Sequence, residues 1–293
     1  DYILGIPLFA QKIGKENLSS LLCRLGNPEK AIPAVHVAGT NGKGSTCRAL
    51  AQMLTGMGYR VGLFTSPHLV SINERIQIDG ENISDADFVW AFETVKEKFT
   101  QHPSFFEVMF AMAAVYFREK KCDFVVYETG MGGRLDATNV LMPELSIITS
   151  VGMDHMEYLG DTIEKIAAEK AGIIKPGIPI IYFKRDEAVA KVIEDTARGQ
   201  KSPVIPVEKQ DYIINHLGDK TIDFSLHSRY YSYCNLVIQK TSLYQLENIS
   251  LAVMAFYGLM KARNASEEDI ENGIRETLPE FYWEGRMEEI APH

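Results

Sequence analysis

The fold of this chain is decided by residues 34–46, which read Ala34-Val35-His36-Val37-Ala38-Gly39-Thr40-Asn41-Gly42-Lys43-Gly44-Ser45-Thr46. An apolar alternating run leads into a glycine-rich loop, and a helical pattern follows with Ala49, Leu50, Met53 and Leu54 on one face. A strand, a glycine loop and a helix in this order bind phosphate, because backbone N–H groups and the helix dipole point at the anion. The segment therefore predicts a nucleotide-binding loop.

The loop offers both an adaptable backbone and a cation. Gly39 and Gly42 can adopt backbone angles that bring N–H donors close to a phosphate, and Lys43 can reach the terminal phosphates. The match to the pattern G-x-x-x-x-G-K-[ST] is imperfect, because Val37 stands at the first glycine position and Gly44 directly follows the lysine. An ordinary turn before a helix is the alternative. We expect the nucleotide to contact the following residues: Thr40, Asn41, Gly42, Lys43, Gly44 and Ser45.

Composition restricts the class of protein. The 293 residues are 46% hydrophobic, which suffices for a full core in one large or two small domains. The formal net charge of −9 argues against nucleic acid as the main partner, and no apolar run is long enough to span a membrane. The four cysteines lack paired short spacings, so we expect small buried thiols in a reduced, cytoplasmic protein, which we also expect to be a monomer.

Strand and helix patterns alternate along most of the chain after a helical arm in residues 1–30. The expected strands of the main sheet cover residues 34–38, 60–65, 123–127, 145–149 and 178–183. The expected helices cover residues 84–99, 105–121, 245–261 and 266–278. From Ser202 the character changes, and residues 223–226 and 230–238 resemble antiparallel strands. The pattern predicts an α/β fold like that of P-loop NTPases: a mostly parallel sheet with helices on both faces and a small antiparallel flank.

Polar side chains follow several of these strands. Ser66 and Glu128 lie at the ends of two of them, and Asp154 and His155 follow a third. Ligands gather at the carboxyl ends of strands in open parallel sheets, so we expect these groups to meet near Lys43. Oxygen and imidazole ligands beside nucleotide phosphates suit Mg²⁺. Taken singly, each has an ordinary alternative: a turn-forming serine, a solvated glutamate or a hydrogen-bonded histidine.

A second glycine-rich segment directly follows Glu128. It reads Thr129-Gly130-Met131-Gly132-Gly133-Arg134-Leu135-Asp136-Ala137-Thr138-Asn139. Its glycines let the backbone fold close to a ligand, and Arg134 can clamp a carboxylate or a phosphate through two hydrogen bonds. A flexible surface loop is the alternative.

Several motifs, in this order along the chain, resemble those of the folylpolyglutamate synthase/dihydrofolate synthase family of Mur ligases. They are Gly39–Ser45, Thr65-Ser66-Pro67-His68-Leu69, Asn73-Glu74-Arg75-Ile76, Glu128–Asn139, Asp154-His155 and Glu169-Lys170-Ala171-Gly172-Ile173-Ile174-Lys175. The resemblance extends from Ile6 to Arg286, which is nearly the entire chain.

The resemblance implies an ATP-dependent amide ligase. ATP would phosphorylate a carboxylate, either the γ-carboxylate of a folate glutamate tail or that of dihydropteroate. The amine of L-glutamate would then attack the acyl phosphate and expel phosphate. By the same resemblance Ser66, Glu128 and His155 hold Mg²⁺, which with Lys43 can offset the charge on the transferring phosphoryl group.

The resemblance further implies that Lys170 is carbamylated. Carbamylation would turn this cation into an anion able to bind magnesium. From the residues alone, the alternative is an unmodified lysine paired with a nearby carboxylate of Glu169, Glu164 or Asp161.

Other positions are assigned through the resemblance. Asn248 matches an asparagine near the adenine, and Arg286 matches an arginine that reaches ATP phosphates, although Glu284 stands where the family has proline. The segment expected to contact the pterin is Ser104-Phe105-Phe106-Glu107. Aromatic rings could stack on a pterin, whereas burial in the core is the plainer role for the two phenylalanines.

In the family, a smaller α/β domain follows the arginine motif. This chain ends at His293 without the Asp-x-Ala-His-Asn-like element of that domain. We therefore interpret residues 1–293 as the ATP-binding domain without the C-terminal glutamate-ligase domain, and expect weak nucleotide binding and no amide product from it alone. A P-loop kinase or NTPase and a different Mur-type ligase are the alternative functions.

Overall fold

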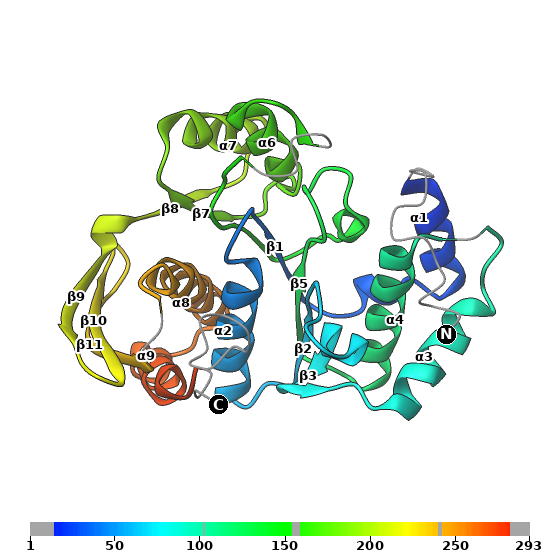
Figure 1. The fold of residues 1–293 in the computed structure, drawn as a ribbon, viewed down its shortest axis with the longest axis horizontal. Helices are drawn as coiled ribbons and strands as arrows, with labels where there is room; N and C mark the ends of the chain where they lie inside the picture. The colour runs from blue at the N-terminus through cyan, green and yellow to red at the C-terminus, as the bar shows by residue number, and fades with distance from the viewer. Residues whose placement is uncertain (1–14, 102, 154–158, 240–241, 282–293) are drawn as a thin grey trace, which may run out of the picture.

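The computed structural model describes residues 15–101, 103–153, 159–239 and 242–281. Within these residues the chain is organised around an eight-stranded sheet with the order β4-β3-β2-β5-β1-β6-β7-β8 (Figure 1). Six strands are parallel: β1 (Ala34–Ala38), β2 (Val61–Phe64), β5 (Phe124–Glu128), β6 (Leu145–Ile148), β7 (Ile180–Lys184) and β8 (Val204–Glu208). The predicted α/β fold with a mostly parallel sheet is confirmed.

Strand β1 lies inside the sheet, between β5 and β6, and all five of its residues are buried. Parallel strands covered on both faces read as nearly continuous apolar runs, which explains why five of the six parallel strands, all but β8, could be predicted from the sequence. At one edge of the sheet, β3 (Ile76–Ile78) pairs antiparallel with β2, and β4 (Glu81–Asn82) pairs antiparallel with β3. These two short strands were not predicted from the sequence.

Helices cover both faces of the sheet, as predicted. Alternate residues of a strand point to opposite faces, so Val35 and Val37 share a core with α2 (Lys43–Gly56) and α8 (Gln245–Ala262). The opposite face carries α4 (Phe105–Glu119), with α1 (Lys15–Arg24) and α3 (Asp85–Lys96) beside it. Figure 1 shows α2 and α8 to the left of the central strands and α4 to the right.

The remaining helices complete these layers. Helices α6 (Ile163–Ala171) and α7 (Glu187–Gly199) pack together and share a core with Tyr182 of β7. Helix α9 (Glu267–Thr277) packs against α2 and α8. Helix α1 lies within the predicted arm of residues 1–30 and ends before Gly26 and Asn27, both of which have positive φ.

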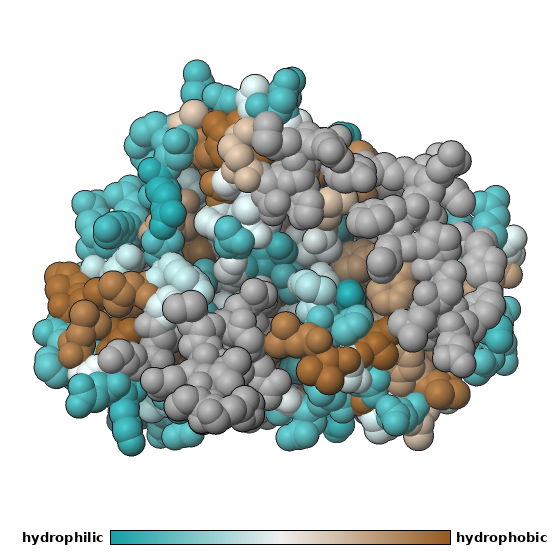
Figure 2. All heavy atoms as spheres, viewed as in Figure 1, coloured by the Kyte–Doolittle hydropathy of each residue, from teal (hydrophilic) through white to brown (hydrophobic). Residues whose placement is uncertain are grey.

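The small antiparallel sheet has the order β11-β10-β9, built from β9 (Tyr212–Leu217), β10 (Thr221–His227) and β11 (Ser232–Gln239). Its buried side chains, such as Phe224 and Ile238, join the core beneath α8. On its exposed side, apolar residues gather at the left of Figure 2, and Ile213 and Leu217 of β9 are more than half exposed. The predicted flank is confirmed.

One boundary of that prediction is wrong. The change of character was placed at Ser202, yet β8 still pairs in parallel with β7 and belongs to the main sheet. Pro206 interrupts the apolar pattern of β8, and proline is tolerated there because β8 is an edge strand that needs hydrogen bonds on one side only.

The cysteines differ in part from the expectation. All four are free thiols, but Cys47 and Cys122 are buried whereas Cys23 and Cys234 are exposed. The expectation of buried thiols is therefore wrong for two of them, because α1 and β11 turn these positions away from the core. None of the described helices is both long and apolar enough to cross a membrane.

Candidate nucleotide and acyl-activation site

The phosphate loop connects the end of β1 to the start of α2. Gly42 lies in the left-handed region with a φ of 84°, and a Cβ at this position would lie 2.0 Å from the Asn248 amide oxygen. Only glycine fits this turn, which brings α8 against the loop. The first described backbone hydrogen bond of α2 runs from Thr46 N to Gly42 O (2.9 Å). The N–H groups of residues 43–45 precede it at the helix N-terminus, where anions bind.

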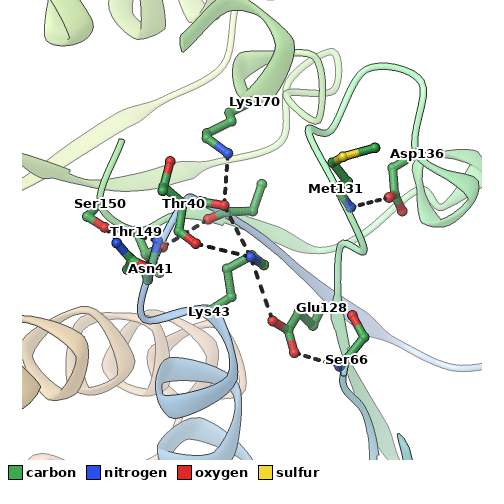
Figure 3. A network of polar contacts seen from close by, with 12 residues as sticks. Thr40, Asn41, Lys43, Ser66, Glu128, Met131, Asp136, Thr149, Ser150 and Lys170 are labelled. Carbon is green, nitrogen blue, oxygen red and sulfur yellow. Dashed lines mark hydrogen bonds and ion pairs between the residues drawn. The ribbon is translucent and has the colours of Figure 1, made fainter. Parts of the chain in front are cut away.

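Three predicted site residues meet beside this terminus (Figure 3). The Lys43 Nζ donates to the carbonyl oxygens of Gly39 and Thr40 (3.3 Å each) and lies 3.9 Å from Glu128 Oε1. The other carboxylate oxygen of Glu128 accepts a hydrogen bond from Ser66 N (3.0 Å). The structure therefore brings Lys43, Ser66 and Glu128 to one edge of the sheet.

Lys170 reaches the same loop from α6. Lys170 is 2% exposed, and its Nζ donates to Gly39 O (2.9 Å). Because Lys43 Nζ donates to the same oxygen, two lysine amines converge on one carbonyl. Of the carboxylates considered as its partners, Glu169 accepts from Arg134 and Asp161 accepts from Lys165. Arg134 is itself exposed, and its guanidinium is engaged with Glu169 in this structure.

The second glycine-rich segment is fixed by Asp136. The buried carboxylate accepts from Met131 N (2.9 Å), Thr138 N (3.0 Å) and Thr138 Oγ1 (2.6 Å), and burial raises the pKa of Asp136. Thr138 Oγ1 also lies 2.8 Å from Nε2 of His36 on β1. The alternative of a flexible surface loop is wrong for this segment, because these contacts tie it to the central strand. This structural role of Asp136 was not predicted from the sequence, although the residue lies within the family motif.

A further pair of residues escaped the sequence analysis. Thr149 and Ser150 follow β6, and their side chains contact Asn41 of the phosphate loop. Two hydroxyl residues at the end of a buried strand were the available signal.

The segment expected to contact a pterin has a clear structural role. Ser104 is the N-cap of α4 and forms a capping box with Glu107. Phe105 is buried beneath the guanidinium of Arg75, whose Cζ lies 5.2 Å from the ring centroid. Phe106 is partly buried and packs against Gly130, where a Cβ would lie 2.8 Å from the ring. Phe106 is therefore the one of these four residues that the structure places against the second glycine-rich segment.

Replacing Ser104 with alanine tests the capping role. We expect the free energy of unfolding to fall by about 1 kcal/mol, because the α4 N-terminus loses the side-chain acceptor for the Glu107 N–H. Urea denaturation measures the loss, and the matched variant Ser104→Thr should retain stability. A decrease in folate affinity from Ser104→Ala without loss of stability would contradict a purely capping role.

Three predicted positions, Asp154, His155 and Arg286, lie outside the described residues. Among the described ones, no group of three or more His, Cys, Asp or Glu side chains is placed to hold a metal ion. The residues present nevertheless suit Mg²⁺: a buried carboxylate and a neighbouring serine flank a helix N-terminus, and Mg²⁺ commonly combines one or two carboxylates with phosphate oxygens. The thiol of Cys47 on α2 is fully buried, and this burial raises its pKa well above the usual range.

Comparison with known proteins identifies the family. Residues 37–256 match the Mur ligase middle domain. The chain is 40% identical over 304 residues to the dihydrofolate synthase/folylpolyglutamate synthase of Bacillus subtilis, covering all of this chain and 70% of that protein. The chain belongs to the folylpolyglutamate synthase family of Mur ligases.

Other members of the folylpolyglutamate synthase family agree. The enzyme of Lacticaseibacillus casei is 33% identical over 302 residues, covering 99% of this chain and 69% of that protein. The solved apo form of L. casei folylpolyglutamate synthase superimposes with a TM-score of 0.91 at 32% identity, over 99% of this chain and 73% of that one. A complex of that family member with AMPPCP and folate matches equally well, with a TM-score of 0.91 at 32% identity over 99% of this chain and 72% of that one.

Proposed function

We propose that this chain uses ATP to activate a carboxylate for amide formation with the amine of L-glutamate. The carboxylate is the γ-carboxylate of a folate glutamate tail, and also the carboxylate of dihydropteroate. The observation that carries the proposal is the convergence of Lys43, Lys170 and Glu128 on the loop at the α2 N-terminus. The named relatives support the substrate class, since one is called a dihydrofolate synthase/folylpolyglutamate synthase. The AMPPCP–folate complex of the L. casei enzyme supports both ligands.

The chemistry follows from the charges at this site. A carboxylate is a weak electrophile. Its oxygen attacks the γ-phosphorus of ATP, the bond to the β-phosphate oxygen breaks, and an acyl phosphate and ADP form. The N–H groups of residues 43–45 and the Lys43 ammonium stabilise the negative charge during this transfer. The glutamate amine then attacks the acyl carbon, loses a proton, and expels phosphate.

We assign Glu128 and Ser66 as residues that hold Mg²⁺, with His155 as the third ligand. Bound magnesium would supply positive charge beside the transferring phosphoryl group. Asn248, whose side chain lies against Gly42 of the phosphate loop, is proposed to lie near the adenine as well. Arg286 is proposed to contact the phosphates of ATP. Arg134, Ser104, Phe105, Phe106 and Glu107 remain proposals for the folate side.

Lys170 is proposed to carry a carbamate. The buried amine lies against the phosphate loop, where an anion on this side chain would face the proposed magnesium site. In bicarbonate buffer, we expect native mass spectrometry to detect one added carbon dioxide, which is lost in the Lys170→Arg variant. An unmodified Lys170 at saturating bicarbonate, in a protein that binds ADP normally, would contradict carbamylation.

The deciding experiment is a ligation assay on the intact enzyme. The purified full-length enzyme, rather than residues 1–293 alone, is incubated with ATP, Mg²⁺, radiolabelled L-glutamate and either tetrahydrofolate or dihydropteroate. We expect a labelled folate conjugate and one ADP for each amide formed. Release of ADP that does not depend on glutamate or on a folate substrate would instead favour the P-loop NTPase alternative.

A further inference from the structure

The phosphate loop is attached to the segment that follows β6, residues 149–152. Thr40 N donates to Ser150 O (2.7 Å). The Thr40 hydroxyl donates to Gly152 O (3.2 Å) and accepts from Gly152 N (3.1 Å). The first residue of the turn is therefore held through both its backbone and its side chain.

Two hydroxyl groups hold the next residue of the loop. Thr149 Oγ1 donates to Asn41 O (2.7 Å), and Ser150 Oγ donates to the same oxygen (3.1 Å) while accepting from Asn41 N (3.2 Å). We call these two side chains, of Thr149 and Ser150, the hydroxyl clamp. Figure 3 shows both residues beside Asn41.

Gly39 lets the clamp approach the loop. A Cβ at Gly39 would lie 1.8 Å from Thr149 Oγ1, so any side chain there would displace the threonine hydroxyl. Thr149 is almost fully buried, and its backbone N–H is bonded to Ala38 O (2.9 Å). The Thr149 hydroxyl is therefore held in place at the end of β6, and its hydrogen bond fixes the position of Asn41 in the phosphate loop.

The clamp divides the N–H groups of the loop into two sets. Those of Thr40 and Asn41 are used to anchor the turn to residues 149–152. Those of residues 43–45 remain at the α2 N-terminus, after the left-handed turn at Gly42. The direction of these phosphate donors thus depends on where Asn41 is held.

We propose that Thr149 and Ser150 are positioning residues for phosphate recognition. By fixing the Asn41 carbonyl, their hydroxyls set the first turn of α2 toward the phosphates of the nucleotide, and they contribute nothing to binding of the nucleoside. The inference rests on the proposed function, because the phosphate ligand is taken to be that of ATP.

The test compares ligands with and without phosphates. Thr149→Val keeps the shape and removes one donor, whereas Thr149→Ser keeps the donor. We expect Thr149→Val to weaken ADP binding about fivefold to tenfold, the effect of one lost hydrogen bond, and to leave adenosine affinity unchanged. Thr149→Ser should bind ADP like the wild type. Isothermal titration measures ADP, and competition against ADP measures adenosine.

Ser150→Ala provides an independent second variant, because Ser150 is only partly buried and exchanges two hydrogen bonds with Asn41. It should also weaken ADP binding while sparing adenosine, even if Thr149→Val fails to fold. Wild-type ADP affinity in both variants, or equal losses for ADP and adenosine, would overturn the inference. Absence of ADP binding by the wild type would instead contradict the proposed function.

Discussion

Replacing Lys43 with alanine is expected to lower the rate of ATP-dependent ligation by about 100- to 1,000-fold, the usual effect of removing one preorganised charge-stabilising donor. The ammonium lies between the carbonyls of the phosphate loop and the carboxylate of Glu128, 15% exposed and within reach of a phosphate at the α2 N-terminus. Amide formation by the full-length enzyme under saturating substrates measures kcat, and titration with ADP measures the loss of binding.

The control variant is Lys191→Ala, which removes the charge of an exposed lysine on α7, distant in sequence from the phosphate loop. It should leave the rate unchanged. Lys43→Arg should recover little activity, because a planar guanidinium cannot occupy the compact position between Gly39 O and Thr40 O. A Lys43→Ala enzyme with wild-type kcat would show that the loop does not act on the transferring phosphoryl group.

The second large effect is expected for Glu128→Gln. The amide keeps the size of the side chain and can still accept a hydrogen bond from Ser66 N, but it loses the negative charge proposed to hold Mg²⁺. We expect the rate to fall by about 100-fold or more, with a higher Mg²⁺ concentration needed for half-maximal activity. A titration of ligation rate against Mg²⁺ at fixed ATP measures both.

Stability separates this effect from misfolding. When Glu128 is neutralised, the Lys43 ammonium keeps its hydrogen bonds to Gly39 O and Thr40 O, and its side chain is 15% exposed to water, so the midpoint of thermal unfolding should not fall greatly. The matched control is Glu276→Gln, an exposed glutamate on α9. An unchanged Mg²⁺ dependence in Glu128→Gln would remove this residue from the proposed metal site.

Much of the fold could be predicted because the strands of a doubly covered parallel sheet are apolar without interruption. The run at Asp123–Tyr127, for example, marks β5 (Phe124–Glu128) correctly to within one residue. Helices α3 and α4 could be predicted because Ser84 and Ser104 are N-cap residues with local hydrogen bonds. Strands β8 and β9 were missed, since Pro206 interrupts one and the other is mostly exposed.

The sequence by itself determined the phosphate loop, the strands that carry Ser66 and Glu128, and the family motifs, because these depend on neighbouring residues and on strand ends that meet at one edge. Only the tertiary structure decided which groups hold that loop. Lys170 reaches Gly39 across 131 positions of the chain, and Thr149 reaches Asn41 across 108. No local pattern encodes such hydrogen bonds, since each partner is a backbone carbonyl, which every residue possesses, and its position is set only when β1, β6 and α6 pack together.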